Sequence, residues 1–421
     1  MRVLVLSTTT GYQLRSFGDA AERLGIELVL ATDRCHQLDD PWRDGAIAVR
    51  FYDEEASLQA ITAVARQRPF SGILAVGDRP TVLAARAAEA LALPGNPVAA
   101  AEATRSKKTM RRLFAAAGMS TPWFFQLPAD ADPAVAAGHI AYPCVVKPLG
   151  LSGSRGVIKA DTAAQFDYAV RRVRALLARP DLQAQRTGLT DELLVEGYIE
   201  GREYAVEGLM THGELSALAV FDKPDPLDGP FFEETIYVTP SVLSPEVHRG
   251  VVAEVRRATA ALGIVHGPIH AECRVGSGIT MLEVAARPIG GLCSKVLRFT
   301  SEGEPTSLEE VLLRHATGED VSRYTREPVA AGVMMIPIPR RGIYKGVLGE
   351  LAARLVPGID EVRITAKVDQ LLEPLPEGDS YLGFIFARAP EPHDAVAALR
   401  EAHRLLRFDV DPELRVLRGT S

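Results

Sequence analysis

The first hundred residues alternate between short apolar runs and stretches with helical spacing. Three apolar runs are predicted strands, at residues 2–6, 27–31 and 73–76, and two amphipathic stretches are predicted helices, at residues 13–24 and 81–91. Strand and helix in alternation predict a parallel sheet of doubly wound type, so we expect an α/β domain over residues 1–103. The segment 7–11 follows the first strand but lacks a GxGxxG pattern, so a nicotinamide dehydrogenase loses its main support.

The pattern changes beyond residue 103. Thr104 is predicted to cap a helix that runs to Ala117 and is closed by Gly118, because its apolar positions recur every three or four residues. Further helices are expected at residues 161–178, 245–262 and 394–406, and further strands at residues 330–336 and 381–387. The chain contains no internal repeat and no low-complexity tract.

Two strands with alternating polar and apolar residues are separated by a turn at Ser277-Gly278. A two-residue turn predicts the register in which Val275 faces Thr280 and Glu272 faces Glu283. Opposed residues have Cβ atoms roughly 4.5–5.5 Å apart, so the two carboxylates repel each other unless a cation lies between them. Carboxylate oxygens suit Mg²⁺, which in proteins also keeps waters and substrate phosphate oxygens as ligands.

The opposite face of this hairpin carries Ala271, Cys273, Leu282 and Val284, and we expect it to face the core. Arg287 lies two positions beyond Ala285 on the same face as the glutamates, where a guanidinium can reach an oxyanion near the metal. The alternative is a solvated face on which arginines only screen the glutamates.

A strand of β-branched residues delivers Lys147 into a loop rich in glycine and serine. Glycines let backbone N–H groups approach phosphate oxygens, serine hydroxyls add donors, and the ammonium group adds a mobile charge. We therefore expect a phosphate site formed by Lys147, Ser152, Gly153, Ser154, Gly156 and Val157. The segment is not a Walker A loop, because no helix begins there, and a flexible hairpin is the alternative.

A second apolar strand leads into a segment in which acidic and aromatic residues alternate. Glu196, Gly197, Tyr198 and Ile199 follow this strand, and Glu203 comes after a glycine turn. Such a hinge can present backbone groups to adenine and a carboxylate to ribose, although an ordinary strand–turn–strand unit explains the pattern as well.

Composition narrows the class of protein. The 421 residues include 47% hydrophobic and 24% charged residues with a net charge of −7, so no basic footprint indicates nucleic acid or an anionic membrane as a partner. No apolar run approaches the ~20 residues of a membrane span. The N-terminus becomes polar too soon for a signal peptide, and the four cysteines form no CxxC pair. We therefore expect a cytoplasmic protein.

These features, taken in order, resemble the ATP-grasp superfamily over nearly the whole chain. The resemblance rests on Ser106-Lys107-Lys108, on Val145-Val146-Lys147-Pro148, on the hinge and on the two glutamates with Arg287 four residues after the second. It implies an ATP-grasp architecture with a Rossmann-like N-terminal domain, a mobile α+β lid, a central antiparallel sheet domain and a C-terminal α+β domain. The implied domains are residues 1–103, residues 104–325 with the lid at about 120–205, and residues 326–421.

The resemblance also implies roles for single residues. By it, Lys107 and Lys147 contact the phosphates of ATP, Glu196, Tyr198 and Ile199 border adenine, Glu203 meets ribose, and Glu272 and Glu283 bind one or two Mg²⁺ ions, with Mn²⁺ as a substitute. Arg287 would stabilise a reacting acyl phosphate, so Arg287 and Lys147 are the expected catalytic residues.

Within the superfamily, His270-Ala271-Glu272, the segment 283–291 and the end of the chain are most similar to bacterial L-amino acid ligases. This similarity implies an ATP-dependent ligase that joins the carboxylate of an amino acid to an amine. The reaction would pass through an acyl phosphate and release ADP and phosphate. Two residues depart from the common pattern. Ala285 stands where many ATP-grasp enzymes have Asn, which puts the second metal site in question, and Gly197 replaces a more usual acidic residue.

Two other functions stay open at this point: an ATP-grasp ligase of purine or biotin-carboxylase type, and a non-catalytic ATP-binding regulatory protein. The complete set of lysines, glutamates and arginine argues against the second. The expected partners are ATP and small carboxylate and amine substrates, with neither nucleic acid nor membrane, and a homodimer stays open. Candidate substrate residues are His270, Glu233, Glu234, Gly290 and Gly291, each of which also has a purely structural explanation.

Overall fold

Four parallel strands form the sheet of the N-terminal domain, as the alternating pattern predicts. The computed structural model describes residues 1–8, 14–33, 46–185 and 188–413, so most of the segment 7–11 lies outside the described residues. The strand order is β3-β2-β1-β4, with β1 at Arg2–Ser7, β2 at Glu27–Thr32, β3 at Ile47–Ala48 and β4 at Gly72–Val76. The helices are α1 Leu14–Leu24, α2 Glu54–Gln67, α3 Thr81–Ala90 and α4 Val98–Arg105, of which α2 and α4 were not predicted.

An antiparallel sheet of eight strands runs through the middle of the molecule, in the order β13-β12-β9-β10-β11-β17-β21-β19. Its strands are β9 Arg202–Thr211, β10 Glu214–Asp222, β11 Ile236–Thr239, β12 Gly267–Val275, β13 Ile279–Ala285, β17 Ala330–Ile336, β19 Ile359–Ile364 and β21 Gly383–Ala389. Helix α9, Pro245–Leu262, packs on one face through Val251 and Val255, which lie in the same apolar cluster as Ile269 of β12. Strands from the last hundred residues therefore extend the central sheet.

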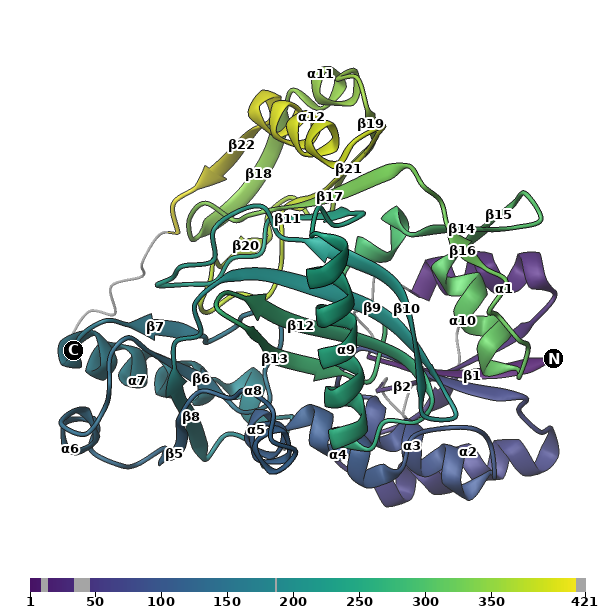
Figure 1. The fold of residues 1–421 in the computed structure, drawn as a ribbon, viewed down its shortest axis with the longest axis horizontal. Helices are drawn as coiled ribbons and strands as arrows, with labels where there is room; N and C mark the ends of the chain where they lie inside the picture. Colours follow the sequence, from purple (N-terminus) through teal and green to yellow (C-terminus); the bar gives the residue numbers. More distant parts are fainter. Residues whose placement is uncertain (9–13, 34–45, 186–187, 414–421) are drawn as a thin grey trace, which may run out of the picture.

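A smaller sheet with its own core forms the lid. Its order is β5-β8-β6-β7, with β5 at Phe124–Pro128, β6 at Cys144–Pro148, β7 at Ile158–Ala160 and β8 at Glu192–Gly197. Helix α7, Ala163–Leu177, buries the predicted stripe of Phe166, Val170, Val173 and Leu177 against this sheet. Two short helices complete the lid, α6 Pro133–Ala137 and α8 Pro180–Gln183. In Figure 1 the lid lies at the lower left and the C-terminal helices lie at the top.

The remaining elements surround the central sheet. One three-stranded sheet contains β14 Arg298–Ser301, β15 Glu304–Ser307 and β16 Thr325–Arg326, and a second contains β18 Gly342–Leu348, β20 Leu371–Leu372 and β22 Arg407–Asp411. The helices of this part are the 3₁₀ turn η1 Cys293–Val296, α10 Leu308–Ala316, α11 Glu350–Arg354 and α12 Pro392–Leu405. Helix α12 packs on β17 and β21 through Leu399, which closes the core of the C-terminal segment.

The predicted helix over residues 104–117 is wrong at its start. Helix α4 ends at Arg105, and a new helix, α5 Lys107–Ala116, begins after Ser106. Ser106 has an extended backbone and its hydroxyl accepts a hydrogen bond from the backbone N–H of Thr109, so Ser106 is the N-cap. Thr104 instead donates its hydroxyl to the carbonyl of Ala101 inside α4. This break between the two helices makes Lys107 the first residue of α5.

No helix in the described part of the chain is long and apolar enough to cross a membrane.

Candidate active site

A cavity of about 700 Å³ lies where the N-terminal domain, the lid, the central sheet and the C-terminal segment meet. Most residues singled out from the sequence line it: Lys107, Lys147, Ser152, Gly153, Ser154, Val157, Glu196, Tyr198, Ile199, Glu203, Glu234, His270, Glu272, Glu283, Arg287, Gly290 and Gly291. Gly156 and Glu233 do not line it. Gly156 has φ +74° and donates its N–H to the carbonyl of Pro376, so it turns the loop beside the cavity.

The floor of the cavity is the predicted hairpin, and Glu272 faces Glu283 as expected. The prediction for the end of the hairpin is wrong: Val275 faces Ile279, because the register shifts between Glu272 and Cys273. Such a bulge places two residues of one strand opposite a single residue of its partner and interrupts the alternation of faces.

The shift also changes which side chains face the core. Met281 is buried in the core cluster with Ala271, Cys273 and Val284, whereas Leu282 lines the cavity beside Glu283. The predicted core face was therefore right for three of its four residues and wrong for Leu282.

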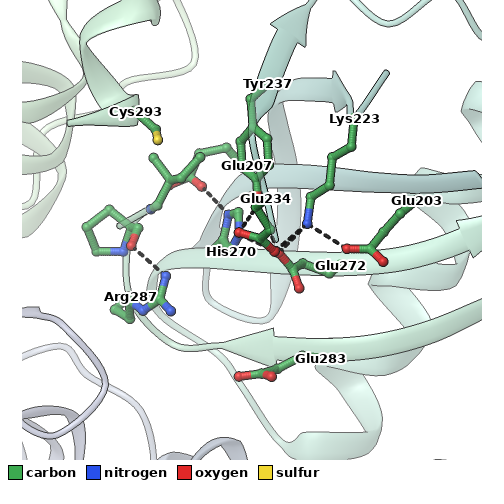
Figure 2. A network of polar contacts seen from close by, with 12 residues as sticks. Glu203, Glu207, Lys223, Glu234, Tyr237, His270, Glu272, Glu283, Arg287 and Cys293 are labelled. Carbon is green, nitrogen blue, oxygen red and sulfur yellow. Dashed lines mark hydrogen bonds and ion pairs between the residues drawn. The ribbon is translucent and has the colours of Figure 1, made fainter. Parts of the chain in front are cut away.

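Each of the two opposed glutamates is bound by a lysine. Lys223, which the sequence analysis assigned no role, places its Nζ 2.7 Å from Glu203, 2.8 Å from Glu234 and 2.8 Å from Glu272. Lys107 places its Nζ 3.2 Å from Glu283. Figure 2 shows Lys223 reaching into the group of three carboxylates, with Glu283 on the neighbouring strand.

Burial and charge oppose each other at this group. Burial tends to lower the pKa of Lys223, but Glu203, Glu234 and Glu272 outweigh it and raise that pKa well above its usual value. Burial raises the pKa of Glu234 to about 6 even though Lys223 opposes it, whereas Lys223 and His270 together hold the pKa of Glu272 well below its usual value despite burial. The ammonium group therefore stays charged and Glu272 stays ionised.

His270 lies beneath these carboxylates and is fixed by a buried glutamate. Its Nδ1 is 3.1 Å from Glu207 and its Nε2 is 3.5 Å from Glu272. Glu207 also accepts a hydrogen bond of 2.9 Å from the backbone N–H of Ile289. Burial lowers the pKa of His270, but the two glutamates outweigh this effect and raise it to about 9.

The lysine that precedes the glycine loop belongs to a second buried network. Lys147 lies 2.5 Å from Glu196, and Arg111 of α5 binds the same carboxylate at 2.8 Å. Burial lowers the pKa of Lys147 to about 8, although Glu196 opposes the shift. Burial would raise the pKa of Glu196, but Arg111 and Lys147 outweigh it and lower that pKa to about 2. The side chain of Glu196 is therefore held by two cations while its strand borders the cavity.

The hinge forms an aromatic wall. The Tyr198 ring stacks on Phe232 with centroids 6.4 Å apart, and the guanidinium of Arg274 lies 5.0 Å from the Tyr198 ring centroid. Arg274 also donates to Glu203 at 3.1 Å and to the carbonyl of Ile199 at 2.7 Å. A flat wall beside a fixed carboxylate suits a planar base linked to a hydroxylated sugar.

Arg287 is held by a residue of the N-terminal domain. Its Nε and Nη2 donate to the two carboxylate oxygens of Asp78, at 2.9 and 3.1 Å. Asp78 was not predicted as a site residue, because nothing local to either residue indicates a pair that spans 209 positions.

Comparison with known proteins agrees with this geometry. Residues 18–95 match the ATP-grasp N-terminal domain family, residues 140–296 the ATP-grasp domain family, and residues 334–411 the family of L-amino acid ligase C-terminal domain 2. The structure of an L-amino acid ligase from Bacillus licheniformis is similar with a TM-score of 0.81 and 25% identity, over 97% of this chain and 98% of that one.

Two curated relatives extend the comparison. The uncharacterized protein y4rH of Sinorhizobium fredii is 23% identical over 98% of this chain and 84% of its own length. The alanine–anticapsin ligase of Bacillus subtilis is 27% identical over 56% of this chain, and the match spans 52% of that ligase. The three matches follow one another along the chain, which therefore has the ATP-grasp fold, is similar to carboxylate–amine ligases of that fold, and ends in a segment that matches L-amino acid ligase C-terminal domain 2.

Proposed function

We propose that this protein uses ATP to join the carboxylate of an amino acid to an amine, through an acyl phosphate, with release of ADP and phosphate. The observation that carries the proposal is the pair of opposed glutamates, Glu272 and Glu283, on the floor of a cavity that Lys107, Lys147 and Arg287 also line. Lys223 adds a positive charge at Glu272, and Lys107 contacts Glu283. A carboxylate becomes reactive toward an amine once it is phosphorylated, and phosphoryl transfer depends mainly on positioning and charge neutralisation.

The two glutamates offer the donor set that Mg²⁺ prefers. Each carboxylate already binds a cation, Lys223 at Glu272 and Lys107 at Glu283, so both are oriented toward positive charge. One or two Mg²⁺ ions held there, or Mn²⁺ as a substitute, would neutralise phosphate charge.

The chain's own cations serve the phosphates and the reacting carboxylate. Lys147 and Lys107 both line the cavity with the glycine loop, and Lys107 donates to the carbonyl of Leu151 in that loop at 2.7 Å. Lys223 bridges Glu203, the candidate ribose ligand, and Glu272, so its ammonium group lies between the nucleotide side and the metal side of the cavity. Arg287 would bind the oxyanion that gains charge during transfer.

Glu234 is the best candidate for binding the ammonium group of the amino acid. It lines the cavity and already accepts hydrogen bonds from an ammonium group, that of Lys223 at 2.8 Å, and from the hydroxyl of Tyr237 at 2.9 Å. Gly290 and Gly291 border the same region, where backbone without side chains leaves room for a substrate.

The cysteines bear on where the protein is located. Cys144, Cys273 and Cys293 are buried free thiols, which suits a cytoplasmic location.

Trapping the activated carboxylate tests the proposal. Purified protein with ATP, Mg²⁺ and hydroxylamine should form a hydroxamate only when a suitable amino acid is present, and each hydroxamate should be matched by one ADP. AMP as the nucleotide product would contradict the proposal, because it would place the attack on the α-phosphorus. ATP hydrolysis that no amino acid stimulates would instead favour a purine or biotin-carboxylase type of ligase.

A further inference from the structure

The side chain of Arg287 is fixed from two sides before any substrate is bound. Asp78 accepts from its Nε and Nη2, at 2.9 and 3.1 Å, and the carbonyl of Pro288 accepts from its Nη1 at 3.1 Å. Only 11% of the Arg287 side chain and 28% of the Asp78 side chain are exposed to solvent. In Figure 2, Arg287 lies beyond the end of the hairpin strand that carries Glu283.

The number of donors shows what remains for a ligand. A guanidinium carries five N–H groups in a rigid plane. Asp78 takes two of them and Pro288 takes one, so two N–H groups, one on Nη1 and one on Nη2, have no acceptor among the described contacts. These two groups are carried by the neighbouring nitrogens Nη1 and Nη2, so they can bind the oxygens of one carboxylate or phosphoryl group.

Asp78 is itself held in place. It follows strand β4 through Gly77, whose φ of +90° favours glycine, and its carbonyl accepts a hydrogen bond of 2.7 Å from the Thr81 hydroxyl at the start of α3. Burial raises the pKa of Asp78, but Arg287, Lys107 and Ser152 outweigh it and lower that pKa, so the carboxylate is ionised at neutral pH. The ionised Asp78 carboxylate, its two hydrogen bonds with Arg287 and the turn at Gly77 together favour one orientation of the Arg287 side chain.

We propose that Asp78 is a positioning residue for phosphoryl transfer: it holds Arg287 so that the two free N–H groups face the reacting oxyanion. The inference rests on the proposed function. Asp78 comes from the N-terminal domain and Arg287 from the central sheet, so the transfer site is complete only when these two parts are docked. Asp78 takes part in no bond that forms or breaks.

The pair of variants Asp78→Asn and Asp78→Glu tests this role. Asp78→Asn keeps the shape of the side chain but loses its charge, and a misplaced catalytic group costs about 10²-fold in rate. We expect kcat for ADP and hydroxamate formation to fall by about 10- to 100-fold while the Kd for ATP changes less than twofold. Asp78→Glu keeps the charge, so its kcat should be several-fold higher than that of Asp78→Asn.

A matched control removes another ion pair that the N-terminal domain makes with the rest of the molecule. Arg23 of α1 binds Glu310 of α10 at 3.0 Å, neither residue lines the cavity, and Arg23→Gln should leave kcat unchanged. If Asp78→Asn lowered kcat, ATP affinity and melting temperature no more than Arg23→Gln does, Asp78 would be only a structural contact. If Asp78→Asn instead raised kcat and lowered the KM for the amine, Asp78 would compete with a substrate carboxylate. Either result would overturn the proposal.

A measurement on the protein alone separates this inference from the proposed function. The Nε–H of Arg287 donates to Asp78, so its resonance should exchange slowly with water in the wild type and rapidly in Asp78→Asn, with the assignment made by Arg287→Lys. Unchanged exchange would overturn the positioning role even in an active enzyme. Slow exchange in a protein that forms no hydroxamate would leave the pairing intact and contradict the proposed function instead.

Discussion

One lysine changes the picture of the site at the residue scale. Lys223 holds Glu203, Glu234 and Glu272 together, and the exposed fraction of its side chain is 2%. Without a cation these buried carboxylates would repel one another, so the ammonium group of Lys223 stabilises the site in the absence of metal.

Glu283→Gln should remove turnover without harming the fold. Its side chain faces the cavity and contacts Lys107, so the change removes a proposed metal ligand and weakens one partly exposed ion pair. We expect turnover to fall by about 10²-fold or more. The melting temperature of the metal-free protein should stay level or rise slightly, measured against Glu214→Gln on the exposed start of β10. A loss of several degrees relative to that control would show that the glutamate is structural.

Lys147 should give ATP binding a distinct pH dependence. Its pKa is about 8, mainly because burial disfavours the charged form. A lysine with a lowered pKa is charged below that value and neutral above it, so the affinity of the metal-free protein for ATP should be constant below pH 7.5 and fall above pH 8. The decrease should approach about tenfold per pH unit, because only the charged form binds phosphate well.

The arginine variant is the control for this pH dependence. Lys147→Arg carries a charge at all accessible pH values, so its ATP affinity should not change between pH 7 and pH 9.5. Calorimetric titration at several pH values measures both proteins. A wild-type affinity that stays constant up to pH 10 would show that Lys147 is not the phosphate contact.

Local irregularities decide the site at the scale of single elements. The bulge in the hairpin turns Leu282 toward the cavity, and the break between α4 and α5 places Lys107 at a helix start. Lys107 contacts Glu283 from there, and the backbone N–H of Lys107 donates to the carbonyl of Leu149 in the loop. Each irregularity brings a side chain to the cavity that regular periodicity would direct elsewhere.

Ser106→Ala should destabilise the protein by removing the N-cap of α5. The hydroxyl of Ser106 accepts from the N–H of Thr109, and the loss of such a cap costs about 1 kcal/mol. Urea unfolding measures the change, and Ser106→Asn, which also caps helices, should restore most of it. Because Lys107 follows the cap, the alanine variant should also bind ATP more weakly than the asparagine variant. Equal stability of Ser106→Ala and the wild type would contradict the assignment of the cap.

Ion pairs join the lid to the C-terminal segment at the scale of the whole molecule. Arg172 of α7 binds both carboxylate oxygens of Glu377, at 2.6 and 2.8 Å, and Arg155 and Arg179 bind Asp379 and Glu373. Asp379 also lines the cavity, so the segment that receives the lid is part of the site wall. We therefore expect the position of the lid to depend on charges in the C-terminal segment.

Glu377→Gln should loosen the lid. The pair is partly exposed, and such contacts contribute about 1 kcal/mol or less, so we expect the KM for ATP to rise by about two- to fivefold with little change in kcat. Added salt should raise the wild-type KM toward that of the variant, because salt screens exposed pairs.

Arg171→Gln is the control for the lid. Its pair with Asp167 lies within α7 on the exposed surface, so this variant should behave as the wild type does. Faster hydrogen exchange in the glycine loop of Glu377→Gln than of Arg171→Gln would confirm the effect. Equal KM values for the two variants would show that the ion pair does not hold the lid.

The sequence by itself determined the features that depend on local periodicity. The alternation of strand and helix predicted the parallel sheet, and the full span of α9 was predicted because its apolar spacing and its caps agree. The pairing of Glu272 with Glu283 followed from a short turn, since a tight hairpin leaves few registers open. The lysine before the glycine loop could be recognised for the same reason, because motif and strand are adjacent in the chain.

Only the tertiary structure decided which distant charges meet. Arg287 pairs with Asp78 across 209 positions, and Glu196 pairs with Arg111 across 85. Such pairs have no local signature, because any exposed charge on another element would fit the sequence equally well. The fold selects one partner, because a charge buried at the junction of several elements is stable only beside the opposite charge that the packing brings there.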